Sequence, residues 1–109
     1  MKSSKLLIVF VDEQDTWGDE PLYQAILDRL AEREIAGSVA LPGIGAFAGP
    51  HVVEGIEGYA RSRPIAVLAV DTDEKLREVL PSIRPILAGS MMILTDVEVL
   101  AAASPALVS

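Results

Sequence analysis

The segment KLLIVFV at residues 5–11 decides the fold of this chain. It holds six consecutive apolar residues, three of them β-branched, which favours a strand buried inside a sheet. A second segment of the same kind, PIAVLAV at residues 64–70, follows much later in the chain. Because both segments are apolar at almost every position, we expect each strand to be covered on both faces of the sheet.

An amphipathic helix is expected after the first strand. Apolar residues recur at every fourth position from Leu22 to Leu30, which predicts one apolar stripe facing the sheet. Asp19 precedes this pattern and is expected to cap the helix. We expect the helix to run to about Glu34 and Gly37 to end it.

A second helix is expected after residues 64–70. Asp71 and Glu74 have the spacing of a capping box, in which the first residue caps the helix. Pro81 and Pro85 lie inside the apolar pattern that follows, and proline removes a helix donor. The sequence therefore predicts a helix to about Leu80 and an irregular turn beyond it.

Two shorter segments complete the set of predicted strands. Residues 38–41 follow the first helix, and residues 91–100 alternate in the manner of an edge strand. The order β-α-β-β-α-β is that of the α+β ferredoxin-like fold, a four-stranded antiparallel sheet with two helices on one face. We expect one domain over residues 1–100 and a C-terminal tail over residues 101–109.

The predicted fold leaves one face of the sheet without a cover. Two short helices cover only one face, whereas residues 5–11 and 64–70 call for burial on both. A second copy of the chain is the simplest cover, so we expect a closed symmetric homo-oligomer. The alternative is an exposed, mildly apolar face made by Ala66 and Ala69.

The composition argues against several classes of protein. The 109 residues carry sixteen acidic and nine basic side chains, and the basic ones are scattered, which is not expected of a nucleic-acid binder. No apolar run reaches the roughly 18 residues of a membrane helix, so no stable membrane insertion is expected. The absence of cysteine excludes disulfides and thiolate metal sites. We expect a cytoplasmic protein without a metal or cofactor.

A glycine-rich segment is the strongest candidate for a functional loop. Residues 37–51 read GSVALPGIGAFAGPH, with Gly43, Gly45 and Gly49 inside seven positions. Glycine allows a ligand or another backbone to approach closely. These glycines either form an effector cradle whose amides face an anion or belong to a flexible loop without chemical consequence.

Three segments together resemble the PII-like proteins of the domain of unknown function 190. They are Glu20-Pro21-Leu22-Tyr23, Gly43-Ile44 with Phe47 after it, and the helix from Asp71 that leads to Asp96-Val97-Glu98-Val99. The resemblance covers about residues 5–99. It implies a ferredoxin-like subunit, a trimer packed sheet to sheet around a three-fold axis, and a long loop between the second and third strands that contacts protein partners. It also implies that small effectors, usually adenine nucleotides, bind in clefts between subunits.

The chain departs from the family pattern within the glycine loop. The usual turn reads Arg-Gly-Ile-x-Gly-Phe-Gly, whereas Pro42 stands at the arginine position and Ala46 and Ala48 replace two glycines. The missing arginine removes a fork of donors suited to phosphate. Gly45 and Gly49 partly replace the two lost glycines, each at a position shifted by one residue.

The candidate ligand site follows from the loop and its flanks. It comprises Gly43, Ile44, Gly45, Phe47, Gly49, His51, Arg61, Arg63 and Gly89. His51 is the only histidine and acts either on a ligand or as a packing residue. Arg61 and Arg63 have two interpretations: they bind an anion such as phosphate or carboxylate, or they are solvated charges or intersubunit ion pairs. Trp17 and Tyr23 are the candidate interface residues.

The acidic run before the first helix has two interpretations. Its carboxylates could chelate a hard cation, but the spacing lacks the pattern of a calcium loop, which favours a solvated loop. The run comprises Asp12, Glu13, Asp15, Asp19 and Glu20.

No nucleophile with a matching base is visible in the sequence, so a non-enzymatic regulatory protein is expected. The alternatives are a small ferredoxin-like isomerase or lyase that uses His51, or a purely structural oligomer.

Overall fold

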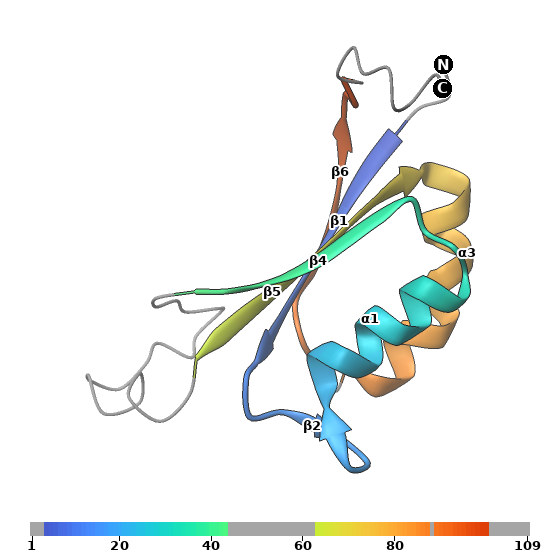
Figure 1. The fold of residues 1–109 in the computed structure, drawn as a ribbon. Helices are drawn as coiled ribbons and strands as arrows, with labels where there is room; N and C mark the ends of the chain where they lie inside the picture. Colours follow the sequence, from blue (N-terminus) through green and yellow to red (C-terminus); the bar gives the residue numbers. More distant parts are fainter. Residues whose placement is uncertain (1–3, 44–62, 88, 101–109) are drawn as a thin grey trace, which may run out of the picture.

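The chain folds as a four-stranded antiparallel sheet with two helices on one face, as a computed structural model shows (Figure 1). The structure describes residues 4–43, 63–87 and 89–100. The sheet has the order β4-β5-β1-β6, so the predicted ferredoxin-like arrangement is confirmed. Its strands are β1 (Ser4–Asp12), β4 (Gly37–Pro42), β5 (Pro64–Thr72) and β6 (Met92–Val97). The other elements are β2 (Thr16–Trp17), β3 (Glu20–Pro21), α1 (Leu22–Glu32), α3 (Asp73–Ile83) and the 3₁₀ turn Arg84–Ile86.

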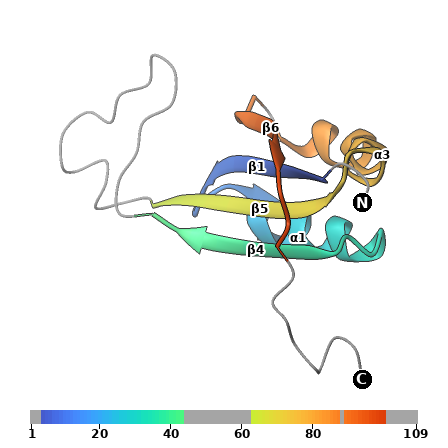
Figure 2. The same ribbon diagram turned by 90° about the horizontal axis from the view of Figure 1, so that it is seen from above.

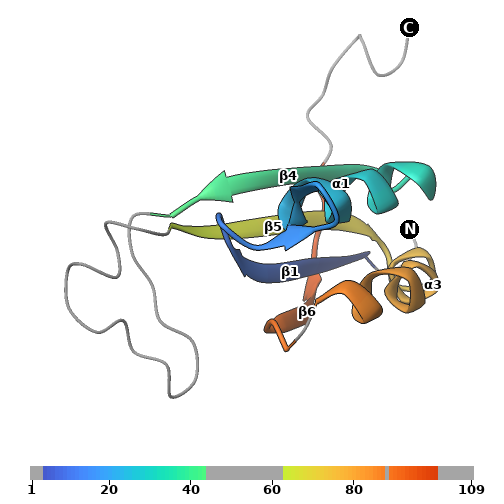
Figure 3. The same cartoon turned by 90° about the horizontal axis from the view of Figure 1, so that it is seen from below.

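The core lies between the sheet and the two helices. Figures 2 and 3 show α1 and α3 side by side on the same face of the sheet. Alternate residues of the central strands point into this layer and are buried, as Leu7, Val9 and Val67 show. They meet the predicted apolar stripes of the helices, represented by Ile26 and Leu76, which are also buried. No helix in the described part of the chain is long and apolar enough to span a membrane.

The first helix begins differently from the prediction. Asp19 was expected to cap it, but the N-cap is Pro21, and among the described residues no side chain caps the helix. The two-stranded ribbon β2–β3 includes this region, and Gly18 turns between its strands with φ of 64°. The amide of Leu22 instead donates to the carbonyl of Asp15 at 2.8 Å. The expected Asp19 cap is therefore wrong, because Asp19 belongs to a hairpin turn.

The helix also ends earlier than expected. Residue Glu34 adopts a left-handed conformation with φ of 55°, a conformation that usually favours glycine. Its carbonyl accepts a hydrogen bond from Lys75 Nζ at 2.8 Å. The following amide of Ala36 donates to Asp71 at 2.8 Å. Gly37 therefore starts β4 and does not end α1, because contacts from β5 and α3 hold the turn at Glu34.

The second helix differs from the prediction at both ends. Its N-cap is Thr72, whose hydroxyl accepts from the amide of Lys75 at 3.2 Å, so the cap lies one residue after Asp71. The helix also continues through Pro81 and ends at Ile83. Ile83 is completely buried, and this packing offsets the hydrogen bond that proline removes.

The last strand occupies an edge of the sheet, as expected, but it is shorter than residues 91–100. It spans Met92–Val97 and pairs with β1, Ser4 standing opposite Val97. Among the described residues, the pairing of β6 with β1 ends at Ser4 and Val97.

Candidate functional site

The described residues on either side of the 44–62 segment lie together at one end of the sheet and are here called the loop base. They are Pro42, the last residue of β4, Gly43 after it, Arg63 before β5, and Pro64, the first residue of β5. The amide of Gly43 donates to the carbonyl of Pro64 at 2.8 Å. The carbonyl of Arg63 accepts from the amide of Glu13 at 2.7 Å, which attaches the loop base to the end of β1. The loop base is thus a fixed part of the sheet.

This close approach leaves little room for a side chain at position 43. A Cβ atom on Gly43 would lie 3.1 Å from the Cγ atom of Pro64 and 3.6 Å from its carbonyl oxygen. The first distance is tighter than ordinary van der Waals contact. Pro42 fits the same geometry, because proline is tolerated on an edge strand such as β4.

Gly89 lies at the same end of the sheet as the loop base. Gly89 has a φ of 89° and precedes β6. The carbonyl of Met91, the residue just before β6, accepts a hydrogen bond from the amide of Phe10 at 3.0 Å. However, β5 and β1 separate β4 from β6 in the sheet. Within one chain, the structure therefore does not bring Gly89 next to Gly43.

The remaining ligand-site predictions lie outside the described residues and stay predictions. These residues are Ile44, Gly45, Phe47, Gly49, His51 and Arg61. Arg63 is described and exposed, and its backbone belongs to the loop base.

The two candidate interface residues differ in their surroundings. Trp17 lies on the β2–β3 ribbon with 44% of its surface exposed. Tyr23 is half-buried in the first turn of α1 and packs against the core. The sequence contains a signal for the ribbon that the prediction missed, because Gly18-Asp19 between two short strands is a typical hairpin turn.

The acidic run forms a hydrogen-bonded turn. The amide of Asp12 donates to Asp15 at 3.0 Å, and the amide of Gln14 donates to Asp12 at 2.7 Å. In the described ranges, no three acidic or histidine side chains converge as metal ligands. These carboxylates serve the turn that leads into the β2–β3 ribbon.

An apolar face of the sheet lies opposite the helices and is here called the open face. The pairing register places Val39, Leu68, Ile8 and Ile93 in one row across all four strands. Val39 is 45% exposed and Ile93 is 39% exposed, so the row ends in exposed side chains at both edges. Neighbouring rows on this face add further apolar residues, namely Leu6, Phe10, Leu41, Ala66 and Val70.

An ionic network supports the helix-side turns. Burial raises the pKa of Asp71, but hydrogen bonds from the amides of Thr72 and Ala36 and the charge of Lys75 outweigh this effect and lower it overall. Lys75 Nζ lies 3.5 Å from the Asp71 carboxylate. Asp71 thus joins the α1–β4 turn to the start of α3.

The fold of this chain matches solved structures of PII-like proteins. A structure of CPII from Thiomonas intermedia K12, bound to ADP, AMP and acetate, matches with a TM-score of 0.66 and 13% identity, covering 92% of this chain and 91% of that chain. A putative PII-like signaling protein from Thermus thermophilus matches with a TM-score of 0.53 and 11% identity, covering 88% and 86% of the two chains. At these identities the likeness concerns the fold.

Sequence comparison identifies the family. The model of DUF190, described as "Uncharacterized ACR, COG1993", matches residues 4–99. A UPF0166 protein of Aquifex aeolicus (strain VF5) is 28% identical over 98 residues, covering 88% of this chain and 92% of that protein. The chain belongs to the DUF190 family, so the predicted resemblance is confirmed.

Proposed function

We propose that this chain is a non-enzymatic, PII-like regulatory protein. It assembles as a homotrimer, binds a small effector between subunits, and signals through the segment between β4 and β5. The observation that carries this proposal is the PII-like fold over nearly the whole chain. The CPII structure of that fold is bound to ADP and AMP, which makes an adenine nucleotide the first effector to test.

The open face supports self-association. Its central residues are apolar on all four strands, and charged side chains are absent from the row of Val39, Leu68, Ile8 and Ile93. Burying such a face against copies of itself removes apolar surface from water, at about 25 cal/mol per Å². A sheet-to-sheet trimer uses this surface and leaves α1 and α3 outside.

The positions of Gly43 and Gly89 support a cleft between subunits. They flank opposite edge strands, β4 and β6, at the same end of the sheet. In a ring of subunits, the β4 edge of one copy faces the β6 edge of the next. The loop base of one subunit and Gly89 of its neighbour then border the same cleft.

A thermal-shift panel tests the effector, and light scattering tests the assembly. The panel contains ATP, ADP, AMP, cyclic nucleotides and bicarbonate, each with and without Mg²⁺. A ligand at a hundred times its Kd stabilises by about 2.7 kcal/mol per site, which raises the melting temperature by several degrees. A rise with an adenine nucleotide supports the proposal. A melting temperature unchanged across the panel contradicts nucleotide binding, and a monomeric mass contradicts the trimer.

A further inference from the structure

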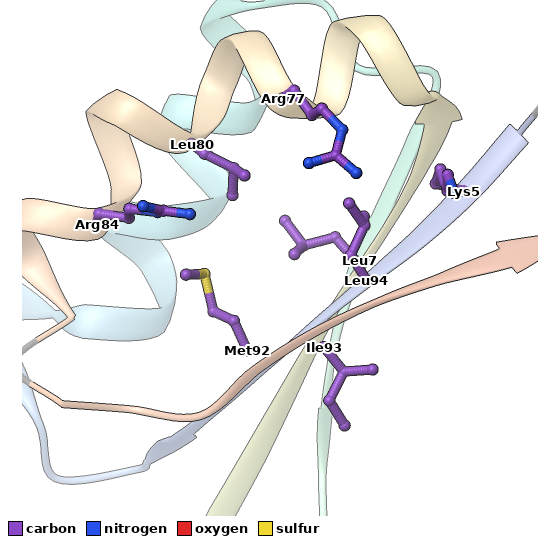
Figure 4. Close-up of a pocket in the computed structure, with 8 residues that line it drawn as sticks. All are labelled: Lys5, Leu7, Arg77, Leu80, Arg84, Met92, Ile93 and Leu94. Carbon is purple, nitrogen blue, oxygen red and sulfur yellow. The ribbon is translucent and has the colours of Figure 1, made fainter.

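A groove of about 250 Å³ lies between α3 and the edge strand β6, away from the loop base (Figure 4). Its floor is apolar and formed by Leu7, Leu80, Met92 and Leu94. Three cationic side chains border it, namely Lys5, Arg77 and Arg84. Clustered cations are unusual in a chain with a net charge of −7, and here they surround an apolar surface.

The helix places the two arginines on the same side of the groove. Arg77, Leu80 and Arg84 follow one another at spacings of three and four residues, so they share one helix face. The Cα atoms of Arg77 and Arg84 are about 10 Å apart along the helix axis, at a rise of 1.5 Å per residue. Figure 4 shows both guanidinium groups above the groove, with Leu80 between them.

Both arginines keep N–H groups that the neighbouring carboxylates do not occupy. The Nε atom of Arg77 donates to the two oxygens of Asp73 at 2.9 and 3.0 Å. Both hydrogen bonds use the single Nε–H group, and Figure 4 shows the terminal nitrogens of Arg77 directed over the groove. Arg84 forms no ion pair with any residue that the structure describes.

Lys5 is neutralised more fully than the arginines. Its ammonium group pairs with Asp96 and lies 3.9 Å from Asp73. The hydrogen bond and charge of Lys5 lower the pKa of Asp96, which therefore stays ionised at neutral pH. Asp96 balances the charge of Lys5 and Asp73 balances that of Arg77, so the remaining positive charge at the groove lies at Arg84.

We propose that this groove binds a small amphipathic oxyanion, a carboxylate or phosphate monoester on a short apolar body. The head accepts hydrogen bonds from Arg77 and Arg84, because a guanidinium matches the two oxygens of such a group. The body lies on Leu80, Met92 and Leu94, which are half-buried and therefore accessible from the groove. The volume lies just below the roughly 300–1,000 Å³ of pockets for drug-sized ligands, which selects a small molecule.

The groove and the proposed trimer contact use different surfaces. Met92 and Leu94 point toward the helices, whereas Ile93 points to the opposite side of β6 in Figure 4. Apart from Ile93, the residues lining the groove lie on the face of the sheet that carries the helices, or on α3 and the turn after it. The groove proposal therefore stands independently of the nucleotide effector, and a silent nucleotide panel does not affect it.

Amide chemical-shift titration of the isotope-labelled full chain tests this proposal. Hexanoate and hexyl phosphate are the probes, hexanamide is the neutral control, and acetate and inorganic phosphate are the head-only controls. We expect saturable shifts at Leu80, Met92 and Leu94 with a charged amphiphile, and binding of every control at least tenfold weaker. The preference between hexanoate and hexyl phosphate identifies the head group.

Substitutions separate charge recognition from nonspecific apolar binding. The double variant Arg77→Gln and Arg84→Gln is expected to raise the Kd at least tenfold, since it removes two charge-assisted hydrogen bonds. Arg84→Lys keeps the charge but loses the fork, so an intermediate Kd is expected. Arg29→Gln on α1 is the matched control and is expected to leave the Kd unchanged. Equal binding by the double variant, or no saturable shift with either probe, overturns the proposal.

Discussion

At the residue scale, the loop base depends on the absence of a side chain at Gly43. Its amide donates to Pro64 at 2.8 Å, and an added Cβ would meet the ring of Pro64 at 3.1 Å. The strands β4 and β5 are paired up to this point, Pro42 standing opposite Ile65. A side chain at residue 43 would therefore press on Pro64 at the end of a paired ladder.

We predict that Gly43→Val abolishes the response to effector while the oligomer persists. The added side chain displaces Pro64 and costs about 1–3 kcal/mol of stability, a typical value for overpacking. Thermal shift with the effector and light scattering without it measure the two properties. Gly37→Val, at the other end of β4, is the control for effector response, because a Cβ at Gly37 meets nothing within 4 Å in the described part of its own chain. An effector response retained in Gly43→Val would show that the loop base does not shape the site.

Asp71 gives a second prediction at this scale, concerning pH. Its folded pKa is lowered, so its contribution to stability is present above the unfolded value of about 3.9 and is lost as the pH falls through the folded value. Asp71→Asn is expected to cost about 1–3 kcal/mol at pH 7, since hydrogen bonds to a charged group are lost. The difference from the wild type then narrows below about pH 4.

Urea unfolding between pH 7 and pH 3 measures this effect. Asp28→Asn is the control, because Asp28 is exposed on α1 and accepts a hydrogen bond from the side chain of Gln24. It is expected to follow the wild-type pH dependence. A constant difference between Asp71→Asn and the wild type at every pH would contradict the role assigned to the Asp71 carboxylate.

At the scale of elements, α3 depends on a cap that lies one residue from the predicted position. The hydroxyl of Thr72 accepts from Lys75 at 3.2 Å, and Asp71 is engaged by Ala36 and Lys75. Thr72→Ala is expected to lower the free energy of unfolding by about 1 kcal/mol, and Thr72→Ser to restore most of it. Denaturant unfolding compares the three chains. Equal losses in both variants would contradict the capping role.

The elements show what sequence patterns resolve and what they do not. The strands at residues 5–11 and 64–70 were predictable because long apolar runs leave few alternatives. The caps were not, because Asp71 and Thr72 both have suitable side chains and the choice depends on Ala36, far away in the chain. Likewise, Asp19 resembles a cap until its place in the hairpin turn is known.

The candidate site divides in the same way. A close approach at Gly43 was predictable because the residue is a glycine. That the approaching residue is Pro64 follows only from the pairing of β4 with β5. The groove gave no local signal, because Arg77 and Arg84 belong to α3 and its continuation while Met92 and Leu94 belong to β6. Only the packing of α3 against the sheet brings these residues together.

At the scale of the whole molecule, the distribution of apolar residues between two faces is the decisive feature. The helix-side face is buried within one chain, whereas the open face retains exposed apolar residues, among them Val39 at 45% and Leu41 at 47%. A small domain has little stability to spare, and large apolar surfaces exposed to water usually mark contacts with another molecule. This imbalance supports self-association, and the proposed number of three subunits comes from the resemblance to PII-like proteins.

We predict that Val39→Glu separates the trimer into folded monomers. Val39 is exposed in the single chain, so a carboxylate there costs the monomer little, but burial against another copy would leave the charge without a partner. Light scattering is expected to give three times 11.6 kDa for the wild type and 11.6 kDa for the variant, with unchanged circular dichroism. Gln24→Glu, which adds the same charge on the exposed side of α1, is expected to remain trimeric. A trimeric Val39→Glu would show that the subunits associate through another surface.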